Sequence, residues 1–403
     1  MALGVNPLLP RLESLELDFS QLDSVGTAWT YAIGTLVSPS LTSISYTAAT
    51  AVHSQGIVTL QSMFHLQALA LRCIVYRGSL FRHFLKNCLM FRNLEVLKLI
   101  HKPKDPRSSV QETRPTISIV TIFETFQNLV DLDIDFRLFS PYMKAKTRVI
   151  TPSPLLQALS ITGNSPDIGE FLLGNIKSSS LQSLTVTMLE PPNLAWKLAC
   201  DNVAASYPQV HSLSFRRDNP TTFQKMLPDD LSSLISRPTM LSLELHGIFH
   251  CFTEATICEL LDSWPDLQNL SITDDYTTYF STSLLIHLSR AVHLRTIKLP
   301  LNITFLEDEL SETTPLAHSH VTELTITGLS SSFPSSEGKI KVAKNLLMLF
   351  PSLERIITHS ASPSHQTYIR ELDELFRSFR SSILTFLRRT SGRRLRAKEE
   401  TEK

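Results

Sequence analysis

Hydrophobic and polar positions alternate along this chain in short segments that recur at a nearly constant interval. The segments follow the pattern L-x-x-L-x-L, in which Val, Ile, Met or an aromatic residue replaces Leu in several copies. Alternate residues of a strand share one face, so each copy predicts a β-strand with one buried face. The third copy is assigned to Leu66, Leu69 and Leu71. The first positions of the thirteen copies are Leu12, Leu41, Leu66, Leu94, Leu129, Leu156, Leu181, Val210, Met240, Leu267, Leu294, Val321 and Leu353.

Between these strands the apolar residues change to a helical spacing. Ile257, Leu260, Leu261 and Trp264 form one such set, and equivalent sets precede the strands near residues 94, 129 and 353. Each set places one apolar stripe on a helix of two to three turns. Several helices are expected to end at an aromatic residue followed by proline, which cannot continue a helix. These pairs are Tyr207-Pro208, Trp264-Pro265 and Phe350-Pro351.

The repeat predicts the fold class and the domain organisation. Its mean period of about 28 residues is that of leucine-rich repeats, whose units must stack because none buries its apolar side alone. We predict an α/β fold, a right-handed leucine-rich-repeat solenoid (a horseshoe) with a parallel β-sheet on the concave face and helices on the convex face. The solenoid covers residues 1–362 in about 13 repeats. A C-terminal amphipathic capping helix at 363–390 and a basic, charged, disordered tail at 391–403 follow.

Composition and motifs exclude several function classes. The 38 basic and 38 acidic residues balance, so no overall field attracts nucleic acid, and no apolar run approaches the ~18 residues of a membrane span. The five cysteines form no CxxC, and no signal peptide precedes the repeats, which favours a cytoplasmic and/or nuclear protein. No Walker loop, GxSxG or HExxH occurs in a suitable context. We therefore expect no enzyme activity and no cofactor.

An acidic strand is the first candidate binding site. Asp131, Asp133 and Asp135 are expected on one face of a strand, with Lys98 one strand away. Such a cluster would attract a basic segment of a partner protein, whereas the alternative is a solvated stripe neutralised in part by Lys98. Two long loops leave the same edge of neighbouring strands and would form a rim. Their basic residues include Lys102, Lys104, Lys144 and Lys146.

A mixed-charge zone is the second candidate site. It comprises Arg216, Arg217, Glu244, His246, Asp274 and Asp275. His246 also lies near His250, Cys251 and Cys258, but no spacing gives four convergent metal ligands, so a metal site is not predicted. The zone serves either as a protein-binding surface or as ordinary solvated surface.

The end of the chain combines an apolar stripe with positive charge. The stripe has helical spacing and would cap the last repeat. From Arg377 onward the sequence holds nine basic and three acidic residues. Arg388-Arg389 and Arg393-Arg394 would serve as a nuclear-import signal or a polyanion contact, or form a solvated tail. The stripe residues are Ile369, Leu372, Leu375, Phe376, Phe379, Ile383, Leu384 and Leu387.

The repeat block, residues 12 to about 360, resembles the leucine-rich-repeat region of F-box/LRR proteins, particularly divergent fungal ones. The asparagine expected three residues after the last repeat leucine is nearly absent, with only Asn164 and Asn302 matching, and this irregularity is similar to that group. The resemblance implies a protein substrate on the concave face and a role in a cullin ubiquitin ligase. A Skp-type linker and cullin are expected only if an F-box module lies upstream, because no segment of this sequence resembles that module. The alternative is an adaptor or regulator unrelated to ubiquitin, such as a small-GTPase regulator or a nuclear assembly factor.

Overall fold

The computed structural model describes residues 8–18, 40–47, 71–78, 91–101, 119–136, 152–163, 168, 177–189, 196–217, 225–273, 280–301, 306, 319–327, 335–358 and 362–401. The chain divides into two compact units. The first unit comprises residues 1–210 and 217–219, and the second comprises residues 211–216 and 220–403.

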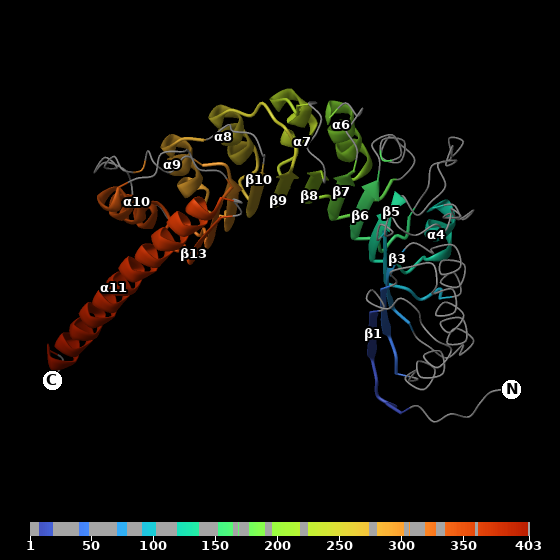
Figure 1. The fold of residues 1–403 in the computed structure, drawn as a ribbon, viewed down its shortest axis with the longest axis horizontal. Helices are drawn as coiled ribbons and strands as arrows, with labels where there is room; N and C mark the ends of the chain where they lie inside the picture. The colour runs from blue at the N-terminus through green and yellow to red at the C-terminus, as the bar shows by residue number, and fades with distance from the viewer. Residues whose placement is uncertain are drawn as a thin grey trace. The chain divides into compact units, whose positions relative to one another are not determined.

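In the first unit, seven strands pair in parallel, and the order of the strands is the order of the chain. Two helices of this unit are described, and α4 lies on one side of the strands (Figure 1). The strands are β1 (Ser14–Asp18), β2 (Ser43–Thr47), β3 (Cys73–Gly78), β4 (Val96–His101), β5 (Asp131–Asp135), β6 (Ala158–Gly163) and β7 (Ser183–Met188); the helices are α4 (Ile119–Thr125) and α6 (Trp196–Ser206).

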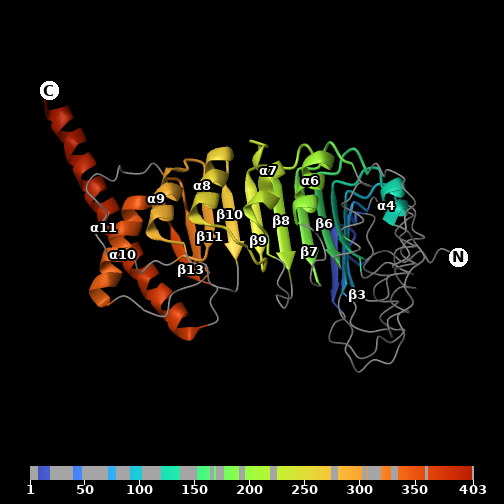
Figure 2. The same ribbon diagram turned by 90° about the horizontal axis from the view of Figure 1, so that it is seen from above.

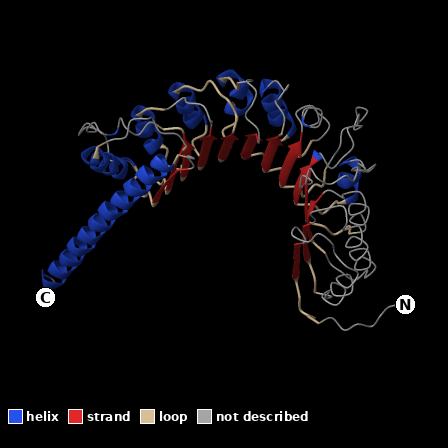
Figure 3. Ribbon diagram, in the orientation of Figure 1, coloured by secondary structure: helices blue, strands red, loops and turns tan. Residues whose placement is uncertain are grey.

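The second unit repeats the same order with a helix in most repeats. Helices α8 and α9 cover one face of its strands (Figure 3). The strands are β8 (Ser212–Arg217), β9 (Ser242–His246), β10 (Asn269–Thr273), β11 (Thr296–Leu299), β12 (Glu323–Ile326) and β13 (Arg355–Thr358). The helices are η3 (Pro228–Leu231), α7 (Ser232–Ile235), α8 (Glu254–Ser263), α9 (Thr282–Arg290), α10 (Ser336–Leu349) and α11 (Pro363–Thr401).

Successive strands are held in register by backbone hydrogen bonds. The N–H groups of Leu241 and Ser242 both donate to the carbonyl of His211, at 2.7 and 3.0 Å. One repeat later, the N–H groups of Gln268 and Asn269 both donate to the carbonyl of Leu241, at 2.8 and 3.1 Å. The same shared-carbonyl arrangement recurs along the first unit. The hydroxyls of Thr42 and Thr322 add bonds to two of these carbonyls, but the recurring bonds of this backbone ladder join main-chain groups and so align the strands in repeats with different side chains.

The repeat leucines form the core, as the sequence predicts. Leu97, Leu132 and Leu270 are each 0% exposed, which confirms their expected burial. One repeat was placed wrongly: β3 begins at Cys73, so the buried positions of the third repeat are Leu71, Ile74 and Tyr76. A β-branched and an aromatic residue fit a pleated, half-buried strand at least as well as leucine does. A prediction based on leucine spacing alone therefore placed the third strand five residues too early in the sequence.

The aromatic residues before proline close the repeats as predicted. Tyr207, Trp264 and Phe350 are all buried. The N–H of Trp264 donates to the carbonyl of Leu260 at 2.9 Å and closes the last helical turn, and the carbonyl of Trp264 accepts the N–H of Leu267 at 3.0 Å. The equivalent bonds recur around Tyr207 and Phe350. Each aromatic residue thus ends a helix and begins the turn into the next strand.

The C-terminal helix α11 is longer than predicted. It runs to Thr401, so residues 391–401 are helical where the sequence analysis expects a disordered tail. The physical reason is intrinsic propensity: apart from Gly392, this segment consists largely of Arg, Leu, Ala, Lys and Glu, which favour helices. Charge was weighted above propensity in the prediction.

Candidate functional site

Two of the groups of polar side chains on the described strands, one in each unit, contain the predicted site residues. Both occupy positions that alternate with fully buried leucine and isoleucine residues. In β5 the residues Asp131 and Asp133 are partly exposed while Leu132 and Ile134 are buried, and β9 alternates in the same way. These side chains therefore project from the sheet on the side opposite the core.

The first group, which we call the acidic strand face, consists of Lys98, Asp131, Asp133 and Ser160. The ammonium of Lys98 lies 2.9 Å from Oδ2 of Asp131, and this hydrogen-bonded partner raises the pKa of Lys98. Burial raises the pKa of Asp133, although a hydrogen bond from Ser160 and the charge of Lys98 oppose that effect. The cluster is thus already neutralised in part within the protein.

Asp135 is buried at the end of the acidic strand face, contrary to the prediction of three accessible carboxylates, although its charge still acts to raise the pKa of Asp133. Its side chain is only 2% exposed, whereas Asp131 and Asp133 remain partly accessible. The last strand position is also buried at Thr47 and Thr273 in other repeats, so side chains at strand ends can be covered by their surroundings. Three carboxylates side by side are therefore reduced to two.

The predicted basic rim of this face belongs to segments that the structure does not describe. Its four lysines, Lys102, Lys104, Lys144 and Lys146, lie outside the described residues.

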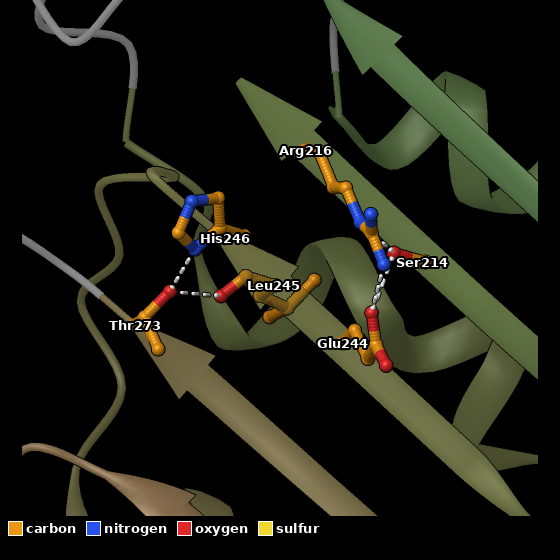
Figure 4. A network of polar contacts seen from close by, with 6 residues as sticks. All are labelled: Ser214, Arg216, Glu244, Leu245, His246 and Thr273. Atoms are coloured by element: carbon orange, nitrogen blue, oxygen red, sulfur yellow. Dashed lines mark hydrogen bonds and ion pairs between the residues drawn. The ribbon is translucent and has the colours of Figure 1, made fainter. Parts of the chain in front are cut away.

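The second group, the mixed-charge strand face, consists of Ser214, Arg216, Glu244, His246 and Thr273 (Figure 4). Arg216 donates from Nη2 to Oε2 of Glu244 at 2.8 Å and from Nε to Oγ of Ser214 at 3.0 Å. The Ser214 hydroxyl donates to the same carboxylate oxygen at 3.0 Å. Burial would raise the pKa of Glu244, but these hydrogen bonds outweigh it and hold the pKa below its usual value. The three side chains form a fixed, ionised network.

His246 occupies the next position along this face. It is the register partner of Arg216 on β8 and of Thr273 on β10. Its Nδ1 lies 2.6 Å from the Thr273 hydroxyl, which also lies 3.5 Å from the carbonyl of Leu245. The ring itself is exposed, so the contact orients an imidazole that a partner can reach.

Arg217 is not part of the mixed-charge strand face, contrary to the prediction. Its side chain is buried, and this burial lowers the pKa of its guanidinium. Adjacent strand residues point to opposite sides, so Arg216 and Arg217 cannot both face the same partner. Asp274 and Asp275 lie outside the described residues.

The histidine nearest this zone has a structural role. His250 is buried and accepts the N–H of Phe252 at Nδ1, 3.2 Å away, while its ring stacks on Phe252 at 4.8 Å. Burial lowers the pKa of His250 to about 4, so the ring is neutral at physiological pH. Within the described ranges, no group of three or more His, Cys, Asp or Glu residues could hold a metal ion. No described helix is long and apolar enough to cross a membrane.

Sequence reasoning missed a cleft in the first unit. The cleft has a volume of about 340 Å³ and lies where β3 to β6 begin. It is lined by Arg72, Asn93, Glu95, Asn128, Val130 and Leu155, and a 3.7 Å ion pair joins Arg72 to Glu95. These residues come from equivalent positions just before the strands of successive repeats. Aligning the repeats by their register could therefore have indicated that they line one cleft.

Comparisons with known proteins identify no relative in sequence. No family model matches the chain, and no curated protein is significantly similar to it. A leucine-rich repeat-containing protein from Legionella pneumophila is similar in structure over 91% of this chain and 90% of its own, with 15% identity and a TM-score of 0.35. An LRR protein of Leptospira interrogans is similar over 90% of this chain and 94% of its own, with 14% identity and a TM-score of 0.36. At these values, neither likeness carries a conclusion about function.

What decides the fold is the strand order together with the period. Thirteen parallel strands follow the order of the chain, and each carries the repeat leucines into the core. The fold is a leucine-rich-repeat solenoid. In this solenoid the acidic and mixed-charge strand faces are two of the described surfaces where charged side chains are held in defined positions by their neighbours.

Proposed function

We propose that this solenoid is a non-enzymatic scaffold that binds a protein partner on its strand faces. The observation that carries the proposal is the mixed-charge strand face, where Arg216, Ser214 and Glu244 hold one another in place. Side chains that are already oriented lose little conformational freedom when a partner binds, which favours specific recognition. A repeat sheet also offers a wide surface for such contacts.

The finer proposal is that the chain is the substrate-recognition part of an F-box/LRR adaptor of a cullin ubiquitin ligase, acting in the cytoplasm, the nucleus or both. Its support is the resemblance of the irregular repeats to those of F-box/LRR proteins. An adaptor that works without ubiquitin would use the same strand faces. The Skp-type linker and cullin distinguish the two roles, because only the first role requires them.

On this proposal the acidic strand face binds a basic segment of the substrate. Both of its carboxylates already have a partner within the protein, since Asp131 is paired with Lys98 and Asp133 accepts a hydrogen bond from Ser160, so a basic segment would compete for them. The mixed-charge strand face adds contacts through the exposed side chains of Arg216 and His246. The basic residues Lys102, Lys104, Lys144 and Lys146 would steer the encounter from the neighbouring loops.

The test is affinity purification of the full chain, expressed with its native N-terminus, followed by identification of its cross-linked partners. We expect one protein to be cross-linked to the strand faces, together with a Skp-type linker and a cullin if an F-box module lies upstream of the repeats. Asp131→Asn with Asp133→Asn should weaken substrate binding by about tenfold or more, since desolvated charges act on dissociation. The linker and cullin should be retained.

The matched control is Glu124→Gln with Asp201→Asn, which removes two carboxylates from helices α4 and α6 of the same unit. It should leave substrate binding unchanged. A substrate without linker or cullin would favour the ubiquitin-independent adaptor. If cross-links avoid the strands, or the paired aspartate variant binds as tightly as the wild type, the strand-face proposal is wrong.

A further inference from the structure

The C-terminal helix α11 has two parts with different surroundings. In the first part, Tyr368, Ile369, Leu372 and Phe376 are buried, and the helix packs on α10 and β13. The carboxylate of Asp373 also accepts the N–H of Ile356 on β13 at 2.8 Å. This part closes the last repeat of the second unit.

The second part continues past the last repeat. From residue 377 to Thr401 the helix extends by about 37 Å at 1.5 Å per residue, and it projects beyond α10 and β13 (Figure 2). The apolar stripe does not stop where the packing stops. Phe379 is only partly buried, and Ile383 is 47% exposed. The sequence continues the stripe with Phe386 and Leu387, giving positions i, i+4, i+7 and i+8.

The polar groups beside this stripe carry little charge. The hydroxyl of Ser382 donates to the carbonyl of Ser378 at 3.0 Å, and that of Thr385 donates to Ser381 at 2.8 Å. Positive charge is instead concentrated farther along the helix, where Arg388 and Arg389 begin a run of basic residues. Arg380 is the one charged residue between Ser378 and Leu387, so most of the positive charge is separated from the apolar anchors along the helix axis.

We propose that this projecting part of α11 binds as a helix in the apolar groove of a partner protein whose groove has an acidic rim. The spacing of Phe379, Ile383 and Phe386 is the one by which amphipathic helices fill such grooves. The net charge of residues 377–403 is +6, which complements an acidic rim. A helix lying on a membrane surface would carry several basic residues on the polar face beside the anchors, whereas here Arg380 is the one basic residue among Ser378, Ser381, Ser382 and Thr385.

The test uses the full chain and Ca²⁺-loaded calmodulin, a probe whose grooves are apolar and whose surface is acidic. Isothermal titration should give a Kd of about 10 μM or tighter. Binding should disappear when a chelator removes Ca²⁺, because the apolar groove then closes. Ile383→Ser and Phe386→Ser should each weaken binding by about tenfold or more. The double substitution Arg388→Gln with Arg389→Gln should weaken binding more at low salt than at high salt, because salt screens the charges that it removes.

The matched control is Met348→Ser, which removes an exposed apolar side chain from α10 in the same unit. It should leave the affinity unchanged. No binding at about 100 μM of the probe, or equal affinities for the wild type and Ile383→Ser, would overturn the proposal. So would tighter association with phosphatidylserine vesicles than with calmodulin, because that result identifies a membrane as the better ligand. None of these outcomes depends on the strand faces.

Discussion

From the burial of Leu270 we derive a quantitative prediction of how this solenoid unfolds. Leu270 is 0% exposed in the middle of β10, with Leu243 and Ile297 as its register partners. Leu270→Ala removes three carbon atoms, which costs about 2.4 kcal/mol in lost transfer free energy at ~0.8 kcal/mol per group. The cavity left in a packed core adds to this, so we expect a total cost of about 3–5 kcal/mol.

The location of the damage is as important as its size. Repeats contact only their neighbours, so the loss of stability should be concentrated in β9, β10 and β11. Native-state hydrogen exchange measures this strand by strand. Protection factors of β9 to β11 should fall by a factor of about 100 or more, while those of β13 should fall much less. The control is Leu227→Ala, since Leu227 is 49% exposed in the same unit.

The control should change the free energy of unfolding by less than about 0.5 kcal/mol. An equal loss of protection in every strand of the second unit would refute the nearest-neighbour reasoning. It would mean that the unit unfolds in one cooperative step.

Three further predictions concern polar side chains. Glu254 of α8 accepts the N–H of Ser281 and the hydroxyl of Ser283 at the start of α9. Burial raises its pKa, but these bonds outweigh burial and lower it, so the stabilisation is present above pH 4.5 and is lost as pH falls through the lowered pKa. Glu254→Ala should cost about 1 kcal/mol at neutral pH in urea unfolding, and equal costs at pH 7 and pH 3 would contradict this account. The His250 ring should titrate near pH 4 by NMR, and stability should fall as pH drops from 6.5 toward 4, because only the unfolded state binds a proton there; a titration near 6.5 would disprove its burial. A double-mutant cycle with Lys98→Gln and Asp131→Asn should give a coupling of about 0.5–1 kcal/mol that decreases in salt, and a coupling above about 2 kcal/mol would mean that the pair is desolvated.

The period-2 pattern predicted the strands because burial enforces it. Leu132 and Ile134 must both face the core, and this places Asp131 and Asp133 on the other side. The pattern did not predict the burial of Asp135, which shares the parity of Asp131 and Asp133 but lies at the end of the strand. Arg217 on β8 instead follows the alternation, because it shares the face of Leu213 and Phe215 and is buried with them. Strand ends depend on how the chain turns away, and the sequence pattern does not carry that information.

The candidate sites were predictable as residue types but not as networks. The sequence placed Arg216, Glu244 and His246 near one another through the repeat register. It did not show that Ser214 would hold Arg216 and Glu244 together, or that Thr273 would orient His246. Such bonds depend on side-chain rotamers. Many strand positions hold serine or threonine, so the sequence does not show which of them forms a bond. The cleft beside Asn93 and Asn128 was missed for a related reason, because it depends on space between side chains rather than on a motif.

The backbone ladder makes each repeat a unit that can be inherited separately from its neighbours. With the corrected third repeat, the intervals between repeats range from 23 to 35 residues, yet the strands stay aligned because the carbonyl of one repeat receives the N–H groups of the next. Excising residues 241–267, one full period, would leave the N–H groups of Gln268 and Asn269 to meet the carbonyl of His211 in the same geometry. Gene duplication and deletion can therefore lengthen or shorten the sheet in whole repeats, and mutation can vary the side chains on its open face without moving the strands.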